Sequence, residues 1–394
     1  MSAGHAITGA AVANCLGADN RSAFDAAFAG ADRFAAATAF FDFPFPTVLG
    51  VLPAYATTDD DRLDCAITRV ATVALASVRQ IRPQVRAAVQ RWGAARVAYV
   101  FASSTGGLEE TERSVAPSPR MAPPATGIRY ADHGIDATSP AIMKHLGIAG
   151  VQLAISTACS SSFKGLASAM RLIDRGLADA VVVGSADSLC RTTVFGFHSL
   201  GLTAPTATQP FSRDRAGITL GEGSAYILLE RGGDLTRPHA LAYVAGVGAA
   251  SDAFHHTSPH PEGLGGQLCM RQAIDRAGIG PNDIDFVSAH GTGTKLNDAA
   301  EAVAVNRVFE RRIPVTATKS LTGHTLGSAG LTSLVLALES LRRQAIPATL
   351  RATAPDEALE IALVTQLAQA KLRHVIVNAF GFGGSNASVV LRAI

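Results

Sequence analysis

Cys159 has the surroundings expected of a nucleophile. It follows an apolar run at residues 151–155, which predicts a buried strand, and precedes an Ala- and Leu-rich run at 162–176, which predicts a helix. The unpaired N–H groups of a helix N-terminus lower the pKa of a nearby thiol and can hold the oxyanion formed when a thioester is attacked. The alternative is a buried structural thiol. That role is expected for the other four cysteines, Cys15, Cys65, Cys190 and Cys269.

Two histidines have related surroundings. His290 ends a predicted strand and is followed by Gly291, and His324 follows Gly323 shortly after Lys319. Side chains at the carboxyl ends of strands lie where open α/β sheets bind their ligands. Two such histidines together with a cysteine at a helix N-terminus favour a catalytic group over structural residues. Zinc is the alternative, but the wide separation of the three residues along the chain fits no compact metal site, so no metal is expected.

Residues 380–386 form an unusual glycine-rich segment that reads Phe-Gly-Phe-Gly-Gly-Ser-Asn. It lacks the lysine of a phosphate-binding loop and the spacing of a dinucleotide fingerprint. One interpretation is a tight turn before the last strand. The other is a loop whose aromatic side chains gate an apolar tunnel.

Alternating strand and helix patterns position these residues. Strand, helix, strand at 151–155, 162–176 and 180–184 is a βαβ unit, which predicts parallel pairing. Small-residue turns open a helix in each half, at 157–162 and 323–328, and hint at an internal duplication. The remaining predicted strands are 96–102, 284–288, 374–379 and 387–392, the remaining helices are 298–309 and 325–343, and loops are expected at 114–124 and 203–216.

Composition limits the class of protein. The chain has 394 residues, of which 48% are hydrophobic and 17% are charged, so it can bury a large core and is not disordered. The formal net charge of +2 gives no support for nucleic acid or an anionic membrane as the main partner. The low charge also fits surface hidden in a subunit interface. Scattered cysteines, no signal-peptide pattern and no membrane-length apolar run predict a soluble cytoplasmic protein.

Four motifs occur in the order seen in one enzyme family. They are Thr157–Ser161, His290–Thr294, Thr318–His324 and Asn378–Asn386. On these motifs the chain resembles the β-ketoacyl-acyl-carrier-protein synthases, of the elongating Cys-His-His type (types I and II) in the thiolase superfamily. The resemblance runs from Ile7-Thr8-Gly9 to the last strand, and further segments at 210–217, 221–223 and 251–255 are similar.

The resemblance implies an α/β fold of the thiolase type. Two similar halves would form a duplicated five-layer αβαβα core with mixed, largely parallel sheets. The halves are expected at residues 1–240, with the nucleophile and loop insertions, and at 241–394, with the histidines and the glycine-rich loop. The family normally forms obligate homodimers, and a heterodimer with a related subunit is the alternative.

The resemblance also implies a decarboxylating Claisen condensation. Cys159 would take an acyl group from a carrier-protein thioester, with the backbone N–H groups of Cys159 and Phe382 as oxyanion hole. Malonyl-carrier protein would then lose CO₂, and His290 and His324, kept neutral by burial, would stabilise the enolate. Lys319 would organise the site. Its expected ion-pair partner is Glu301, with Asp298 nearby, and a purely structural network is the alternative.

Further roles follow from the same resemblance. Thr292 and Thr294 match residues that bind the phosphopantetheine arm, whereas Phe380, Phe382 and Gly383 belong to the gate. The substrates are carried on acyl carrier protein, so no cofactor is expected. Because that protein is acidic, a local basic patch is needed. Its candidates are Arg213 and Arg215.

Three other classes compete with this interpretation. Chain-length factors share the fold but replace the nucleophile, which Cys159 retains. A thiolase-type acyl-CoA transferase would need a second cysteine near the C-terminal glycine-rich motif, and 380–386 contains none. A structural or binding protein of this fold is the third. The sequence leaves the pathway open between fatty-acid and polyketide or aryl-polyene-type chain elongation.

Overall fold

The computed structural model describes residues 4–58, 61, 63, 68–115, 129–309, 311–352 and 354–394. Cys65 and most of the loop expected at 114–124 lie outside this part of the chain.

The helices are α1 (Asn20–Phe28), α2 (Arg69–Trp92), α3 (Leu108–Val115), α4 (Tyr130–His133), α5 (Ser139–Leu146), α6 (Ser161–Asp174), α7 (Arg191–Ser199), α8 (Leu264–Ala277), α9 (Lys295–Val308), α10 (Lys319–Thr322) and α11 (Ala329–Arg343). The strands are β1 (His5–Asn14), β2 (Ala35–Ala36), β3 (Val48–Gly50), β4 (Val97–Ala102), β5 (Gln152–Ile155), β6 (Ala180–Asp187), β7 (Leu220–Gly221), β8 (Gly223–Arg231), β9 (Ala242–Ser251), β10 (Phe286–Ser288), β11 (Pro314–Thr316), β12 (Ala345–Ile346), β13 (Ala362–Leu363), β14 (Ala368–Gln369), β15 (His374–Gly381) and β16 (Ser385–Arg392).

The main sheet is mixed, and its two ends repeat one pairing pattern. Within the described residues its order is β13-β11-β10-β15-β16-β9-β1-β8-β6-β4-β5. In one half β5, β4 and β6 pair in parallel and β6, β8 and β1 antiparallel. In the other, β11, β10 and β15 pair in parallel and β15, β16 and β9 antiparallel. The predicted duplication is therefore confirmed.

The two halves join through β1 and β9. Residues 5–7 of β1 pair with residues 242–244 of β9, so hydrogen bonds run continuously from one half to the other. The link that contains residue 240 lies between a short 3₁₀ turn, Arg237–His239, and β9. The proposed division into 1–240 and 241–394 stays a prediction.

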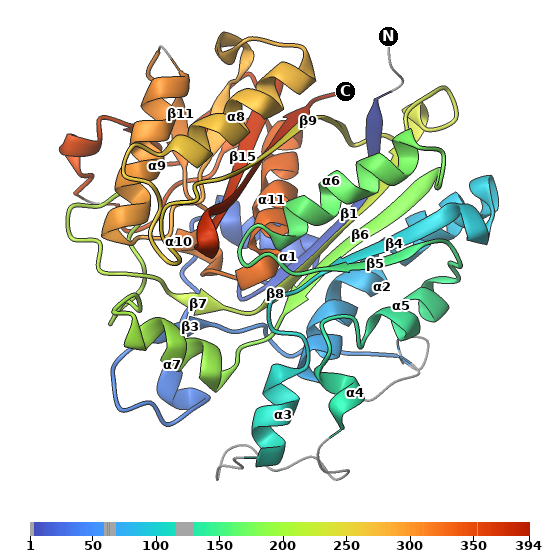
Figure 1. Ribbon diagram of the computed structural model, residues 1–394, viewed down its shortest axis with the longest axis horizontal. Helices are drawn as coiled ribbons and strands as arrows, with labels where there is room; N and C mark the ends of the chain where they lie inside the picture. Colours follow the sequence, from blue (N-terminus) through green and yellow to red (C-terminus); the bar gives the residue numbers. More distant parts are fainter. Residues whose placement is uncertain are drawn as a thin grey trace.

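Helices form the other layers (Figure 1). α2 covers the outer face of β1, β8 and β6, and α8 covers the outer face of β9 and β16. α6 and α11 lie in the middle layer, where each contacts strands of both halves. The two halves of the main sheet form the two sheet layers. The layers therefore follow the order helix, sheet, helix, sheet, helix, which confirms the five-layer αβαβα architecture.

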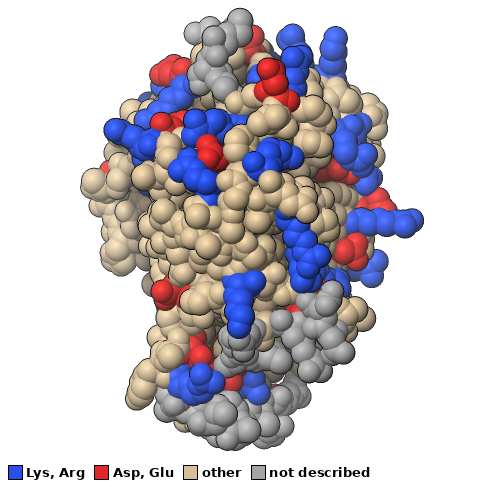
Figure 2. Space-filling model, turned by 90° about the vertical axis from the view of Figure 1, so that its right-hand side faces the viewer, with Lys and Arg blue, Asp and Glu red and all other residues tan. Residues whose placement is uncertain are grey.

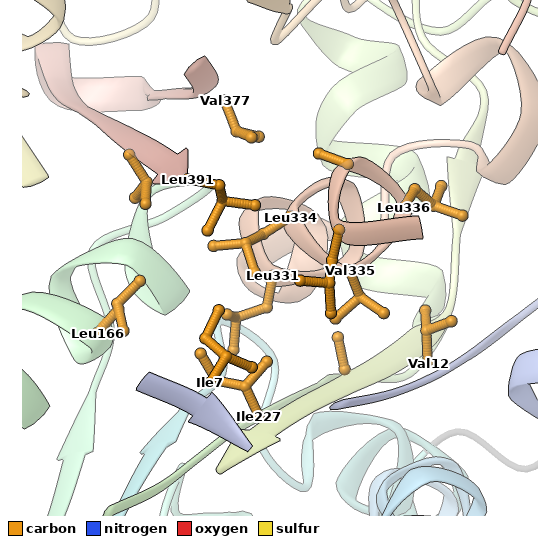
Figure 3. Packing of buried hydrophobic residues seen from close by; sticks show 14 of the residues in the cluster. Ile7, Val12, Leu166, Ile227, Leu331, Leu334, Val335, Leu336, Val377 and Leu391 are labelled. Atoms are coloured by element: carbon orange, nitrogen blue, oxygen red, sulfur yellow. The ribbon is translucent and has the colours of Figure 1, made fainter. Parts of the chain in front are cut away.

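The core explains why the strands are apolar without alternation. In β6, Val181 and Val183 pack toward the middle helices, and Val182 packs toward α2. Because both faces of the sheet are covered by helices, every residue of β6 is buried. Figure 3 shows Leu331 and Val335 of α11 among side chains of both halves.

The predicted elements are found with small shifts at their ends. All six predicted strands are present, and residues 203–216 form bends and turns. The helix expected at 298–309 starts earlier, at Lys295, and the helix expected at 325–343 starts later, at Ala329. The delay has a backbone cause, because Leu326 has φ of 55° and a 3₁₀ turn, Leu326–Ser328, comes first. None of the described helices is long and apolar enough to span a lipid bilayer.

Candidate active site

The loop between β5 and α6 places Cys159 at the floor of a cleft. Ala158 has φ of 52°, in the left-handed region, and this turns the chain sharply before the cysteine. Gly381 comes close from the other half, since a Cβ atom there would lie 3.3 Å from the backbone N of Cys159. Cys159 is 6% exposed and lines the cleft. The expected position before a helix N-terminus is confirmed.

His324 lies in the equivalent loop of the other half, between β11 and α11. Its backbone N donates to Thr219 O at 2.7 Å, and its Nδ1 accepts a hydrogen bond from the Leu326 N–H at 3.1 Å. The proton of the neutral ring is therefore on Nε2. Nε2 lies 3.0 Å from Cys159 Sγ, so this N–H points at the sulfur.

His290 follows β10 and faces the same point. Lys319 Nζ lies 3.1 Å from His290 Nδ1 and donates to the His290 carbonyl at 2.6 Å. Because an ammonium group can only donate, Nδ1 accepts and the ring proton is on Nε2. The two imidazoles meet edge to face with centroids 5.4 Å apart. The cluster thus offers one thiol and two N–H donors.

Burial decides the charge of the imidazoles. It lowers the pKa of His290 and His324 well below the ordinary value, and the positive charge of Lys319 lowers both further. Both rings are therefore neutral at pH 7, as expected. Burial also lowers the pKa of Lys319 to about 8. Because this value is still above 7, most of the ammonium groups stay charged beside His290 at neutral pH.

The expected lowering of the Cys159 pKa is wrong. Burial raises the pKa of this thiol to about 11. Lys319 and the backbone N–H groups of Phe382 and Cys159 act in the opposite direction, because they favour the thiolate. The thiol is protonated at rest, and its proton must leave when sulfur attacks.

The ion pair expected between Lys319 and Glu301 is also wrong. Glu301 Oε1 and Oε2 accept the backbone N–H groups of His290 and Gly291, each at 2.8 Å. Lys319 binds the opposite side of the same loop, at the His290 carbonyl. Among the described residues no ion pair joins the two side chains. Asp298 accepts the N–H of Phe211 at 2.8 Å and that of Gly293 at 3.2 Å, so both carboxylates hold backbone.

The cleft brings the other predicted residues together. Thr292, Thr294, Phe380 and Phe382 line it together with Cys159, His290 and His324. The two threonine hydroxyls are 3.0 Å apart. Phe382 packs against Phe197 with centroids 5.4 Å apart.

The glycine-rich segment is a tight turn between β15 and β16. Gly383 is exposed, has φ of 74° and donates its N–H to His256 O at 2.8 Å. The interpretation as a turn is confirmed, and its aromatic side chains face the cleft. Their role as a gate stays a prediction.

The expectation that Cys159, His290 and His324 are too far apart for a compact metal site is wrong, although other features of the site oppose metal binding. One ligand atom from each of Cys159, His290 and His324 lies within 4.8 Å of the others. The duplicated halves bring these distant residues together. However, both Nε2 atoms carry protons, and the ammonium of Lys319 lies beside His290. A cation held through Nε2 would need new tautomers and would meet this positive charge.

One further prediction differs from the structure. Arg215 does not belong to a surface patch, because it is 7% exposed and its Nη1 lies 2.6 Å from Asp356 Oδ2. Arg213 is exposed.

Asn378 belongs to the site although it was predicted only as part of a motif. It donates to Glu301 Oε1 at 3.1 Å. A polar residue inside an apolar strand pattern was the signal for it.

The charge of Lys319 is expected to set the reactivity of Cys159. Iodoacetamide alkylation should quicken between pH 7 and 9, because the thiolate fraction grows toward a pKa of about 11. The rise should be less than tenfold per pH unit, since Lys319 loses its charge near pH 8. Lys319→Met should slow the reaction at pH 7.5 about tenfold, the effect of one pKa unit. Peptide mass spectrometry measures the rate.

The matched control for this experiment is Lys295→Met. Lys295 also lines the cleft but is exposed, and it should leave the rate unchanged. An alkylation rate that is flat from pH 6 to 8 would contradict the expectation, because it would mean that the thiolate is already formed.

Comparison with known proteins places this site in a family. The family model "Beta-ketoacyl synthase, N-terminal domain" matches residues 6–234, and "Beta-ketoacyl synthase, C-terminal domain" matches residues 241–353. The chain is 33% identical to 3-oxoacyl-[acyl-carrier-protein] synthase 2 of Vibrio cholerae over 77% of each protein. It is 30% identical to the protein of the same name from Coxiella burnetii, over 82% of this chain and 81% of that protein.

Solved structures agree with these relatives. A chain in the complex of a ketosynthase with its chain length factor from Xenorhabdus doucetiae has a TM-score of 0.89 and 34% identity, and the match covers 99% of this chain and 98% of that chain. A β-ketoacyl synthase from Burkholderia phymatum has a TM-score of 0.87 and 25% identity over the full length of both. The chain therefore belongs to the β-ketoacyl synthase family.

Proposed function

We propose that this protein is an elongating 3-oxoacyl-[acyl-carrier-protein] synthase. One observation carries the proposal: a single thiol, Cys159, faces two neutral imidazoles whose protons are both on Nε2. Such a cluster combines a nucleophile for acyl transfer with two donors for a developing oxyanion. The names of the relatives in the family support the same reaction.

In the first step Cys159 Sγ attacks the carbonyl carbon of an acyl thioester on carrier protein. The carbon–sulfur bond to the phosphopantetheine arm breaks, and the thiol proton passes to the leaving sulfur. The backbone N–H groups of Cys159 and Phe382, which favour negative charge at this place, form the oxyanion hole. The product is acyl-Cys159 and free carrier-protein thiol.

In the second step malonyl-carrier protein occupies the emptied cleft. Its carboxylate leaves as CO₂, and the electron pair of the broken C–C bond forms an enolate. The Nε2–H groups of His290 and His324 stabilise the enolate oxygen. The nucleophilic carbon then attacks the carbonyl of acyl-Cys159 and expels the thiolate, which gives 3-oxoacyl-carrier protein. The thiolate takes up a proton from water, and this restores the resting thiol.

The cleft residues suit a long thioester arm. Thr292 and Thr294 line the cleft and present hydroxyl groups to the pantetheine amides. Phe380 and Phe382 also line it, and with Gly383 of the adjoining turn they form the gate between acyl and malonyl substrates. The substrates bring their own prosthetic arm, so the enzyme needs no cofactor or metal of its own. Exposed Arg213 is the remaining candidate for contact with the acidic carrier protein.

We further propose a dimeric cytoplasmic enzyme. β5 is an edge strand of the main sheet, and its residues Gln152 and Ala154 are exposed, so it can pair with another subunit. Figure 2 shows uncharged surface between groups of Lys and Arg on one face, as a subunit interface requires. A homodimer is the first expectation. Ketosynthases solved with a chain length factor keep a heterodimer as the alternative.

The other candidate functions are less well supported. A chain-length-factor role leaves the thiol of Cys159 and its contact with His324 unexplained. Thiolase-type transfer to CoA lacks a second cysteine in the turn at 380–386. The pathway, fatty-acid or polyketide and aryl-polyene-type, follows from the acyl chains that the cleft accepts.

Reconstituted elongation tests the proposal. The purified chain is incubated with acyl-carrier proteins of different chain length and then with malonyl-carrier protein. Intact-mass spectrometry should show acyl-enzyme in the first step and 3-oxoacyl-carrier protein in the second. The set of acyl chains that load defines the substrate. If the mass of the enzyme never increases by an acyl group with any carrier-protein substrate, the proposal is contradicted.

A further inference from the structure

A network of buried, hydrogen-bonded polar side chains lies outside the cleft and reaches the loop that carries His290. Asn378 on β15 is 1% exposed and does not line the cleft. Its Nδ2 donates to Glu301 Oε1 at 3.1 Å, and its Oδ1 accepts from Ser388 Oγ at 2.7 Å. Because a carboxylate only accepts, the orientation of the amide is fixed by these two partners.

The sheet register holds this arrangement in place. Asn378 and Ser388 are direct partners in the antiparallel pair of β15 and β16. On the outer side, Cys269 of α8 lies with its Sγ 3.1 Å from Ser388 Oγ. The chain Cys269, Ser388, Asn378, Glu301 therefore crosses from α8 through two strands to α9. All four residues are buried, so water cannot replace a lost partner.

Glu301 connects Asn378 to the backbone of His290. Its carboxylate accepts three hydrogen bonds, two from the backbone N–H groups of His290 and Gly291 and one from Asn378. Lys319 holds the His290 carbonyl from the other side. The peptide that carries the imidazole is thus fixed at both its N–H and its C=O, and Asn378 fixes the carboxylate that binds the N–H.

We propose that Asn378 is a positioning residue for the decarboxylation step, acting through Glu301 on His290, with Ser388 holding its amide. The assignment rests on the proposed condensation. It predicts that a variant loses decarboxylation selectively. Cys159 and His324 are held by other loops, and among the described residues neither hydrogen-bonds to Cys269, Ser388, Asn378 or Glu301. Acyl loading should therefore survive when decarboxylation is lost.

The test variant is Asn378→Leu, which keeps the side-chain size and removes both hydrogen bonds. Malonyl-carrier protein decarboxylation should fall about tenfold or more at pH 7, the effect of losing one hydrogen bond to a charged group. Acyl loading of Cys159 should stay within about threefold. Ser388→Ala, which leaves Asn378 in place, should give a smaller loss of the same kind.

The pH profile separates positioning from a structural defect. Burial raises the pKa of Glu301 to about 6, and the Asn378 amide opposes this rise. Asp298, Lys319 and Cys269 are the charged or titratable groups that interact with Glu301, and none changes in the variant. The acid limb of the wild-type decarboxylation rate should therefore move to higher pH in Asn378→Leu, since Glu301 is protonated sooner.

A matched control and a readout without substrate complete the experiment. Asn306→Leu removes an amide from the exposed side of the same helix, α9, and should change neither rate. In protein labelled with ¹⁵N-histidine, Asn378→Leu should shift the His290 ring resonances and leave those of His324 unchanged. His290→Asn identifies the His290 signals.

Two outcomes would overturn the inference. One is equal loss of acyl loading and decarboxylation in both Asn378→Leu and the more conservative Ser388→Ala, because neither variant would then show a selective defect. The other is an unchanged acid limb with unchanged His290 resonances. A wild-type chain that loads acyl groups but never decarboxylates malonyl-carrier protein would instead refute the proposed function, and the His290 resonances would still test the positioning.

Discussion

Cys159→Ala is expected to abolish acyl loading and to reduce condensation by at least about 10⁴-fold, as removal of an enzyme nucleophile does. Among the described residues that line the cleft, Cys159 is the only one with a thiol, and its Sγ is the atom that His324 Nε2 and the backbone of Phe382 approach. No other described side chain has this position. Intact-mass spectrometry of the enzyme after incubation with acyl-carrier protein measures loading, and product analysis measures condensation.

The same variant should keep the decarboxylation of malonyl-carrier protein within about tenfold. Lys319 and the Leu326 N–H bind the Nδ1 atoms of the two imidazoles, and Glu301 accepts the backbone N–H of His290; none of these contacts involves the sulfur. Cys190→Ala is the matched control, since this buried thiol lies outside the cleft and should leave loading intact. If Cys159→Ala still retains an acyl label, the assignment of Cys159 as the nucleophile is contradicted.

Local features of the sequence predicted where the reactive groups lie. Cys159 between an apolar strand and a helix, and His290 at a strand end, are positions that a few neighbouring residues specify. His324 was found in the same way, because its loop repeats the pattern of the Cys159 loop. The duplicated pairing of β5, β4, β6 and β11, β10, β15 then brings the two loops together at one cleft.

Partners and charge states could not be predicted from spacing. Glu301 and Lys319 lie on opposite sides of the His290 loop, so the carboxylate binds N–H groups and the ammonium binds a carbonyl. Arg215 is drawn inward to Asp356, a residue far along the chain. The raised pKa of the Cys159 thiol depends on burial by segments of both halves, which no local sequence pattern predicts.

Removing the imidazoles one at a time should separate the two steps of the proposed reaction. His290→Ala is expected to reduce decarboxylation about 10²- to 10³-fold, the usual effect of removing one donor from an oxyanion site. Acyl loading should stay within about threefold, because the His290 ring hydrogen-bonds to Lys319, whereas the hydrogen bond to Cys159 Sγ comes from His324. His324→Ala should reduce both steps, since its Nε2–H lies 3.0 Å from the sulfur as well as facing the enolate.

The double variant decides whether the two donors act together. If both N–H groups bind one enolate oxygen, the first loss already misplaces it, and the effects on decarboxylation should be much less than multiplicative. His239→Ala, an exposed histidine outside the cleft, should change neither step. Equal losses of loading in His290→Ala and His324→Ala would contradict the division of roles, because only the His324 ring donates toward Cys159.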